Sequence, residues 1–197
     1  MPRLLYQGHS SMRIWSDRGT VIYIDPFVGQ GYEPPADIVI VTHEHSDHNR
    51  VSLVTLKEGG RILRARDLFS KGAYQTFEID QIAIMGVPAT NENHPVTECV
   101  GVLLDVDGIL IYHAGDTSYT DFMLKRLGDI DLDYAFLPVD GVYNMGPEEA
   151  SFCADAIGAR HTVPIHTKPG ELFDRSVAEQ LECEGRLILE PSDDIAL

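Results

Sequence analysis

An uninterrupted apolar run that ends in a cluster of polar, metal-binding side chains constrains this fold more than any other feature of the sequence. Residues 38–41 are all isoleucine or valine, and they lead through Thr42 into the segment His-Glu-His-Ser-Asp-His at positions 43–48. Such a run is typical of a strand buried on both faces, as in a sheet covered by helices. The cluster is then expected on the loop at the carboxyl end of that strand, where open α/β sheets place their sites.

The side chains of this loop have the ligand chemistry that suits zinc, manganese or iron. His43, His45, Asp47 and His48 supply four candidate ligands within six residues. A loop with three histidines can also be a solvated polar turn, but this spacing after a buried strand favours a metal site. One ion need not take all four ligands, so the cluster leaves room for two neighbouring ions.

The length and charge of the chain indicate one domain that acts on small molecules. The 197 residues can bury a substantial core without disulfides, and no linker divides them, so we expect a single domain over residues 1–197. The 31 acidic and 15 basic residues give a net charge of -16, which argues against general binding of nucleic acid. The sequence leaves a homo-oligomer open.

The cysteines and the hydropathy pattern indicate a cytoplasmic protein. Cys99, Cys153 and Cys183 are odd in number, far apart and without a CxxC pattern, which is typical of reduced thiols. The N-terminal segment lacks the apolar core of a signal peptide, and no apolar run approaches a membrane span. We therefore expect no membrane association.

Local patterns predict a chain dominated by short strands. Strands are expected at residues 4–7, 12–15, 20–24, 38–42, 61–65, 74–79, 81–87, 98–106, 109–116, 133–139, 161–167 and 186–190. Helices are expected at residues 51–58, at 121–127, from 147 onward and at 175–183.

An internal similarity suggests how these elements are arranged. Residues 17–25 and 37–45 share a hydrophobic pattern with residues 106–116 and 133–141: a turn, a strand with an acidic end, a loop, and a buried strand. Chance is the alternative, because the match lies mostly in the apolar positions. A true repeat predicts an α+β fold of two similar halves, packed sheet to sheet with helices outside as a four-layer αββα sandwich.

The histidine cluster and several later segments resemble one known family. Residues 43–48 are similar to the HxHxDH motif of the metallo-β-lactamase superfamily, whose fold is an αββα sandwich. The segments GHSS, IDPF, THEHSDH, YHAGDT, YNMGPEEA and PIHT resemble its branch of small metal-dependent hydrolases that includes ascorbate-6-phosphate lactonase. The resemblance covers nearly the whole chain.

The resemblance implies a shared site for two ions. It assigns His43, His45 and His94 to the first ion, Asp47, His48 and His166 to the second, and Asp116 to a bridge between them. A bridging carboxylate is what two neighbouring dications require to offset their repulsion. Asp25 is interpreted as a residue that holds the ligand loop through hydrogen bonds. Taken singly, His94 can be a surface histidine, Asp116 a helix cap and His166 a core histidine.

Asp47 and Asp116 are the predicted catalytic residues, and four others are candidates for substrate binding. Asp47 would aim the attacking water by accepting a hydrogen bond from it. The candidates for substrate binding are His9, Tyr143, Asn144 and Lys168. The alternatives are a turn histidine at position 9 and a solvated lysine at position 168. His113 and His161 are expected to be structural.

The predicted function is metal-dependent hydrolysis of a small anionic ester, of the phosphodiester or lactone type. The expected cofactors are two divalent ions, zinc or manganese with iron as a further option, which lower the pKa of water so that it attacks as hydroxide. Two alternatives remain, a non-catalytic module that binds a metal or ligand and a nuclease of the same fold. The sequence does not name the substrate, because specificity depends on loop shape.

Overall fold

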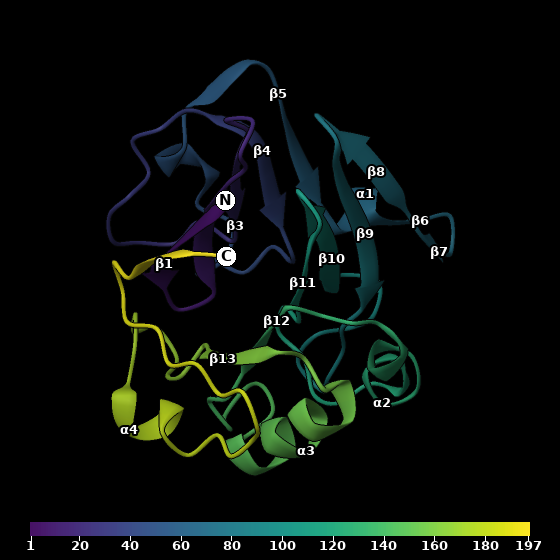
Figure 1. The fold of residues 1–197 in the computed structure, drawn as a ribbon. Helices are drawn as coiled ribbons and strands as arrows, with labels where there is room; N and C mark the ends of the chain where they lie inside the picture. The colour runs from purple at the N-terminus through teal and green to yellow at the C-terminus, as the bar shows by residue number, and fades with distance from the viewer.

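Two six-stranded sheets, packed face to face, form the frame of the molecule (Figure 1). The computed structural model describes residues 1–197. The first sheet has the order β14-β1-β2-β3-β4-β5, with β1 Arg3–Gly8, β2 Ser11–Trp15, β3 Val21–Ile24, β4 Ala36–Val41, β5 Leu56–Arg64 and β14 Asp194–Ala196. The second has the order β13-β12-β11-β10-β9-β8, with β8 Thr76–Ile79, β9 Ile82–Pro88, β10 Val100–Val106, β11 Ile109–His113, β12 Tyr134–Pro138 and β13 His161–Ile165.

The two sheets repeat one pattern of strand directions. From β1 to β5 the successive pairings are antiparallel, antiparallel, parallel and parallel. The pairings from β9 to β13 follow the same succession. An antiparallel edge strand extends each set, β14 beside β1 and β8 beside β9. The predicted organisation in two similar halves is therefore confirmed.

The central core lies between the sheets and takes one face of each strand. In β3, Ile22 and Ile24 point into this core, while Val21 and Tyr23 pack on the outer face of the sheet. Opposite them, Val102 of β10 belongs to the same central cluster. Each such side chain contributes about 1.5–3 kcal/mol when it is fully buried. The alternation of side chains along each strand therefore holds the two sheets together around one shared core.

The two outer layers differ in thickness. On the second sheet, α3 (Pro147–Ile157) buries Ala150, Cys153, Ala154 and Ile157, the spacing of an amphipathic helix. Figure 1 shows α2 (Asp121–Lys125), α3 and α4 (Arg175–Ala178) on the same side of the molecule. The outer face of the first sheet is covered instead by the loop 27–35 and the 3₁₀ turn η1 (Val51–Leu53), through Tyr32 and Val54.

Three of the predicted elements differ in the structure. The helix expected at residues 51–58 is wrong, because only η1 forms before β5 starts at Leu56 and pairs with the open edge of β4. Sheet pairing thus outweighs a local helical pattern. The strand expected at 186–190 is also wrong; Arg186 makes a single bridge to Thr162, and the C-terminal strand is β14. The helix expected at 175–183 ends at Ala178.

A short insertion connects the two halves. It consists of α1 (Ala65–Leu68) and the hairpin of β6 (Phe69–Ser70) and β7 (Ala73–Tyr74), of which only the terminal residues Ala65 and Tyr74 lie in predicted strands. A second 3₁₀ turn, η2 (Leu127–Asp129), follows α2. Every helix falls short of the length and apolar character needed to cross a membrane.

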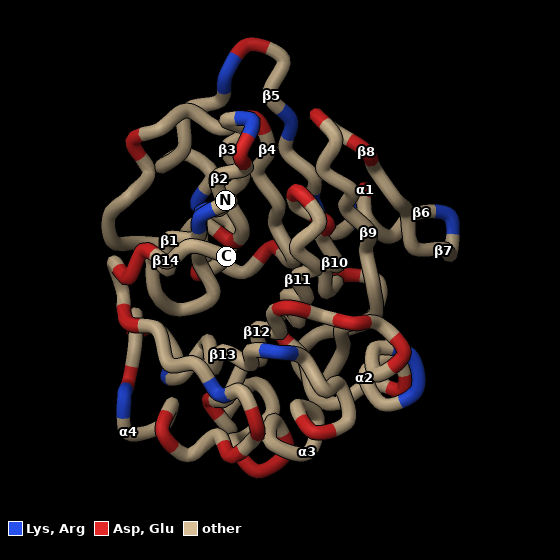
Figure 2. Tube along the Cα trace, viewed as in Figure 1, with Lys and Arg blue, Asp and Glu red and all other residues tan.

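Figure 2 shows acidic segments over both halves of the molecule, with basic segments between them. The negative charge counted in the sequence is therefore spread over the surface. Because the negative charge is spread out, the charged side chains of individual loops determine which charged molecules each region can bind.

Candidate metal centre

The strand directions bring the candidate ligands to one edge of the sandwich. His9 follows β1, Asp25 follows β3, residues 43–48 follow β4, His94 follows β9, Asp116 follows β11 and His166 follows β13. Within each half these strands run in the same direction, so their carboxyl ends meet at one edge. Residues that lie up to 157 positions apart therefore converge.

The candidate ligands form two outer groups, joined by a third in which His43, His48 and Asp116 lie within 4.8 Å of one another. The ring nitrogens of His43, His45 and His94 lie within 4.8 Å of one another, and His94 Nε2 is 3.2 Å from His45 Nδ1. A second group, also within 4.8 Å, joins Asp47 and His166 to His48 and His9. The first group is open to solvent through His45, whereas three of the four residues in the second are buried.

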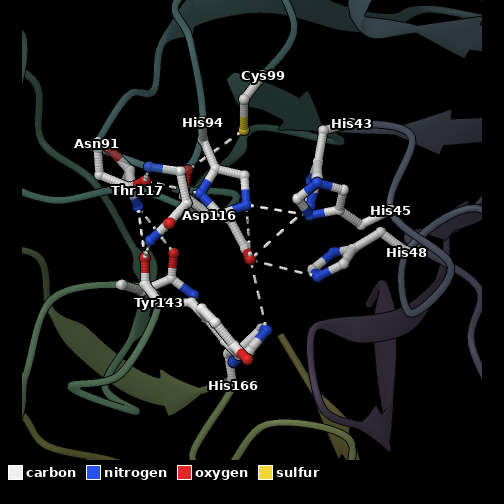
Figure 3. Close-up of polar contacts among 12 residues, drawn as sticks. His43, His45, His48, Asn91, His94, Cys99, Asp116, Thr117, Tyr143 and His166 are labelled. Carbon is white, nitrogen blue, oxygen red and sulfur yellow. Dashed lines mark hydrogen bonds and ion pairs between the residues drawn. The ribbon is translucent and has the colours of Figure 1, made fainter.

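Asp116 lies between the two groups (Figure 3). Its Oδ2 is 3.4 Å from the Nε2 atoms of both His94 and His166, and 3.8 Å from that of His43. Its Oδ1 is 3.3 Å from His48 Nε2. One buried carboxylate therefore faces histidines of both groups, which is the arrangement that the sequence interpretation requires of a bridge.

The histidines are oriented by acceptors on their far side. His48 Nδ1 donates to Asp25 Oδ2 at 2.8 Å, and His166 Nδ1 lies 2.8 Å from Asp140 Oδ2. Because a carboxylate only accepts, these contacts place a proton on Nδ1 of each ring and turn Nε2 toward Asp116. Such acceptors fix the tautomer and ring orientation of metal-binding histidines.

Asp25 also holds the backbone of the ligand loop. Its carboxylate accepts from Thr42 N at 2.7 Å and from Thr42 Oγ1 at 2.6 Å, at the end of β4. Its own φ of 46° is in the left-handed region, which turns the carboxylate inward after β3. Asp25 thus connects the loop backbone to His48, in the supporting position described from the sequence.

The centre concentrates negative charge. Burial alone would raise the pKa of Asp116, but the surrounding histidines, His48 foremost, lower it well below its usual range. Burial lowers the pKa of His48, yet the carboxylates of Asp116 and Asp25 outweigh it and raise the pKa to about 9. Burial and the charge of His48 lower the pKa of His43 to about 3. The centre therefore favours positively charged occupants.

The residues present fit divalent metal ions. His43 Nε2, His48 Nε2 and Asp116 Oδ1 are buried and have no hydrogen-bond partner. Leaving such atoms unpaired costs about 1–3 kcal/mol each, and imidazole nitrogens with carboxylate oxygens are common ligands of zinc and manganese. Metal binding satisfies all three atoms at once.

Two adjoining cavities open onto the centre. One, of about 420 Å³, is lined by eight residues: His45, Ser46, Asp47, Asn93, His94, Asp116, Tyr143 and His166. The other, of about 280 Å³, is lined by His43, Glu44, His45, Ala65, Arg66, Asn93, His94, Pro95, Thr97, Glu98 and Cys99. His45, Asn93 and His94 belong to both linings, so a bound molecule can span the two.

The four predicted substrate contacts occupy different positions. Tyr143 is half-exposed and lines the larger cavity. Asn144 is buried and bonds to Asp140 and Asn91, so it braces the loop beneath that wall. Lys168 pairs with a neighbouring glutamate and lines neither cavity. His9 is fully buried against Asp47 rather than exposed in a cavity.

Neither His113 nor His161 belongs to the ligand groups. The His113 ring is fully buried and bonds to Ser10 O and Gly115 N, as a structural residue would. His161 lies beside Tyr134 at the start of β13.

Several residues of the centre escape the sequence interpretation. Asp140 and Asn91 orient His166 and His94, the latter through a 2.8 Å bond from His94 Nδ1 to Asn91 Oδ1. Arg66 lines the smaller cavity. The position of Asp140 in the sequence could have identified it, because Asp140 follows β12 as the histidine cluster follows β4. Neither Asn91 nor Arg66 carries such a signal.

The matching family model decides the identity of the chain. A model described as a beta-lactamase superfamily domain matches residues 3–166. The chain belongs to the beta-lactamase superfamily. A UPF0173 metal-dependent hydrolase of Methanoculleus marisnigri is 34% identical over 185 residues, covering 83% of this chain and 80% of the relative. Our chain is accordingly a metal-dependent hydrolase of the metallo-β-lactamase superfamily.

Two solved structures show the same fold. The metallo hydrolase Igni18 of Ignicoccus hospitalis is 23% identical, with a TM-score of 0.75 over 98% of this chain and 97% of its own. The metallo-beta-lactamase fold protein YhfI of Bacillus subtilis is 16% identical, with a TM-score of 0.74 over 100% of both chains. The predicted α+β sandwich is confirmed, whereas the narrower likeness to ascorbate-6-phosphate lactonase stays a prediction.

Proposed function

We propose that this metallo-β-lactamase superfamily hydrolase uses two divalent ions, zinc or manganese with iron as a further option, to cleave a small anionic ester. Esters of the phosphodiester or lactone type are the proposed substrates. His43, His45 and His94 would hold one ion, Asp47, His48 and His166 the other, and Asp116 would join them. The observation that carries this proposal is the buried Asp116 carboxylate, which faces histidines of both groups beside a polar cavity.

The chemistry divides between the ions and the protein. Bound divalent ions polarise a carbonyl or phosphoryl oxygen and lower the pKa of water. Asp47 lines the larger cavity with 28% of its side chain exposed, so it can accept a hydrogen bond from the attacking water. Burial would raise its pKa, but a hydrogen bond with His9 and the charge of His48 lower it, which keeps the carboxylate ionised as an acceptor.

Arg66 supports the choice of an anionic substrate. Arg66 lines the smaller cavity together with Glu44 and Glu98. The negative charge of Glu44 is offset by Arg64, from which its carboxylate accepts two hydrogen bonds of 2.7 and 2.8 Å. Arg66 itself is exposed and makes no ion pair, so its guanidinium is available to bind a carboxylate or phosphate in two-point fashion. A substrate anion held there would place its scissile bond over His45 and His94.

Tyr143 would contact the substrate from the opposite wall. Its ring is 52% exposed, on a loop fixed by hydrogen bonds from the backbone nitrogens of Val142 and Tyr143 to Asp140. A phenol held this way offers a donor and an apolar face at low entropic cost.

We also place this hydrolase in the cytoplasm, acting on a small molecule rather than a nucleic acid. All three cysteines are free thiols, and Cys99 and Cys153 are buried. Reduced thiols are usual in that compartment. The net charge of -16 supports a small substrate, because it repels a polyanion.

The direct test removes one ligand of the second ion and, separately, the bridging carboxylate. His48→Ala and Asp116→Ala should each lower turnover more than a thousandfold on a panel of phosphodiesters and lactones with zinc or manganese, and should lower the metal content measured by elemental analysis. His161→Ala is the matched control and should retain both. Unchanged turnover in either ligand variant would overturn the mechanism, and efficient cleavage of RNA at moderate salt would favour a nuclease.

The proposed anion contact has its own test. Arg66→Ala should raise the KM for an anionic ester about tenfold, with little change in kcat, because a hydrogen bond to a charged group contributes about 1.5–3 kcal/mol. A neutral ester of the same size should be unaffected. Lys168→Ala is the control, since Lys168 lies outside both cavities; equal effects of the two variants would contradict the role of Arg66.

A further inference from the structure

We propose that His9 is a further ligand of the second ion, so that His9, Asp47, His48 and His166 surround it together with Asp116. This inference rests on the proposed function, because it assumes an ion between these groups. Nothing in the HxHxDH motif or in the later single ligands includes this histidine. Its position in the structure, its tautomer and its distance from Asp47 carry the argument.

The backbone around His9 is built to hold its ring at the centre. His9 has a φ of 58°, in the left-handed region that costs a non-glycine residue free energy. Its carbonyl accepts from His166 N and from the hydroxyl of Tyr6, both at 2.8 Å, and its amide donates to Leu172 O. These contacts tie His9 directly to the backbone of another ligand residue.

A hydrogen bond sets the tautomer of the His9 ring. Nδ1 lies 2.9 Å from the backbone carbonyl of Glu171, and a carbonyl can only accept. The proton of the neutral ring is therefore on Nδ1, and Nε2 carries the free lone pair. The same logic places the protons of His48 and His166 on Nδ1, so all three rings present Nε2 to one point.

The free nitrogen of His9 faces a carboxylate oxygen. His9 Nε2 lies 3.2 Å from Asp47 Oδ2, which is longer than the 2.7–2.9 Å of a charge-assisted hydrogen bond. Two acceptors at this distance repel each other unless a cation lies between them, either a proton on Nε2, which makes the hydrogen bond to Asp47, or a metal ion that replaces this proton. If an ion lay about 2.1 Å from both atoms, the angle from His9 Nε2 through the ion to Asp47 Oδ2 would be about 100°. This value lies between the ideal angles of octahedral and tetrahedral coordination.

The other ligand rings surround the same point. The His9 ring centre is 3.9 Å from that of His166 and 5.5 Å from that of His48. The ligand atoms of His9, Asp47, His48 and His166 all lie within 4.8 Å of one another. This set is therefore as compact as the set formed by His43, His45 and His94.

An additional nitrogen makes the two ions unequal. With His9, the second ion has four protein ligands besides Asp116, whereas the first has three. The first ion therefore keeps more open positions, and its histidines line both cavities beside Arg66. Substrate is accordingly expected to bind at the first ion, while the second is held more tightly.

The first part of the test is structural. A crystal structure of the full chain saturated with zinc should show His9 Nε2 about 2.0–2.1 Å from the second ion. A separation beyond 3 Å would overturn the inference, and this measurement needs no variant to fold. Two bound ions with a distant His9 would leave the proposed function intact, whereas a single bound ion would contradict both.

The second part measures metal affinity. His9→Asn keeps a residue that tolerates positive φ but removes the ring nitrogen, and it should weaken binding of the second zinc ion by more than a hundredfold in chelator competition. Binding of the first ion should change by less than threefold. His161→Asn is the control, because it removes an imidazole at the opposite end of β13 from His166, and it should leave both affinities unchanged. A loss of less than a hundredfold for His9→Asn would overturn direct ligation, since removing an orienting partner alone costs 10–100-fold.

Discussion

Asp140 connects a metal-binding residue to the wall of the cavity through one carboxylate. Its Oδ2 lies 2.8 Å from His166 Nδ1, and its Oδ1 accepts from the backbone nitrogens of Val142, Tyr143 and Asn144. Burial would raise the pKa of Asp140, but its bond with His166 and the charge of that ring lower it. The loop that carries Tyr143 is therefore held in place by the same group that orients a ligand.

Substitution of Asp140 tests this connection. Asp140→Asn should weaken binding of the second ion about 10–100-fold, less than the loss of a direct ligand, because the amide no longer enforces the Nδ1-protonated tautomer. Metal titration by calorimetry measures the change. Asp133→Asn, at the opposite end of β12, is the matched control and should leave metal affinity intact. Equal losses in both variants would contradict the orienting role of Asp140.

The ligand cluster could be predicted at the residue scale, but its supporting groups could not. His43, His45, Asp47 and His48 are close in sequence, so their chemistry is visible without a fold. Asn91 and Arg66 reach the centre only through the packing of distant strands, and neither has a local pattern that marks it. The same limit explains why Lys168, two residues after His166, lies outside both cavities.

Among the elements, the turn after β11 shows how tightly the backbone positions Asp116. Gly115 has a φ of 66°, and a Cβ atom at this residue would lie 2.6 Å from Val100 O. Gly108, in the turn between β10 and β11, has a φ of 86° and open space around it. Both glycines have a positive φ, but only Gly115 lacks room for a Cβ atom.

This difference predicts unequal effects of alanine. Gly108→Ala should lower the free energy of unfolding by about 1–2 kcal/mol through its positive φ alone. Gly115→Ala should cost about 1–3 kcal/mol more, because β10 must move away. It should also weaken metal binding by displacing Asp116. Urea denaturation and metal titration measure both effects, and equal destabilisation by the two variants would refute the steric argument.

Long-range pairing explains which elements the sequence pattern missed. The buried strand β4 and the helix α3 were predictable because hydrophobic spacing alone defines them. Residues 56–64 instead form a strand because they pair with the free edge of β4, and β14 forms because it pairs with the edge of β1. Their structure depends on partners that lie far away in the sequence, so a local pattern cannot specify it.

On the scale of the whole molecule, the metal centre joins the two halves. Residues 43–48 come from the first half, whereas His94, Asp116 and His166 come from the second. Neither half holds a complete set of ligands for the proposed ions. Metal binding should therefore stabilise the folded protein, because the ligands from the two halves are not held together in the unfolded chain.

Thermal unfolding tests this coupling. Each ion, at a hundred times its dissociation constant, should stabilise the protein by about 2.7 kcal/mol, which raises Tm by roughly 5–10 °C per ion for a chain of this length. Calorimetry of the chelator-treated protein with and without added zinc measures the shift. Asp116→Ala should abolish most of it, while His161→Ala should not. An undiminished shift in Asp116→Ala would place the stabilising ion elsewhere.

The repeated halves have a consequence for how substrate preference can change over time. The loop after β4 carries the histidine cluster, and its counterpart after β12 carries Tyr143 on the cavity wall. Corresponding loops of the two halves thus carry the proposed metal ligands in one case and the proposed substrate contact in the other. Residues 141–143 are exposed, while Asp140 beneath them is fixed, so mutation there can explore new substrates without loss of metal binding. A lineage that keeps the ligand residues of both halves and varies only residues 141–143 can therefore change its substrate while it retains the metal centre.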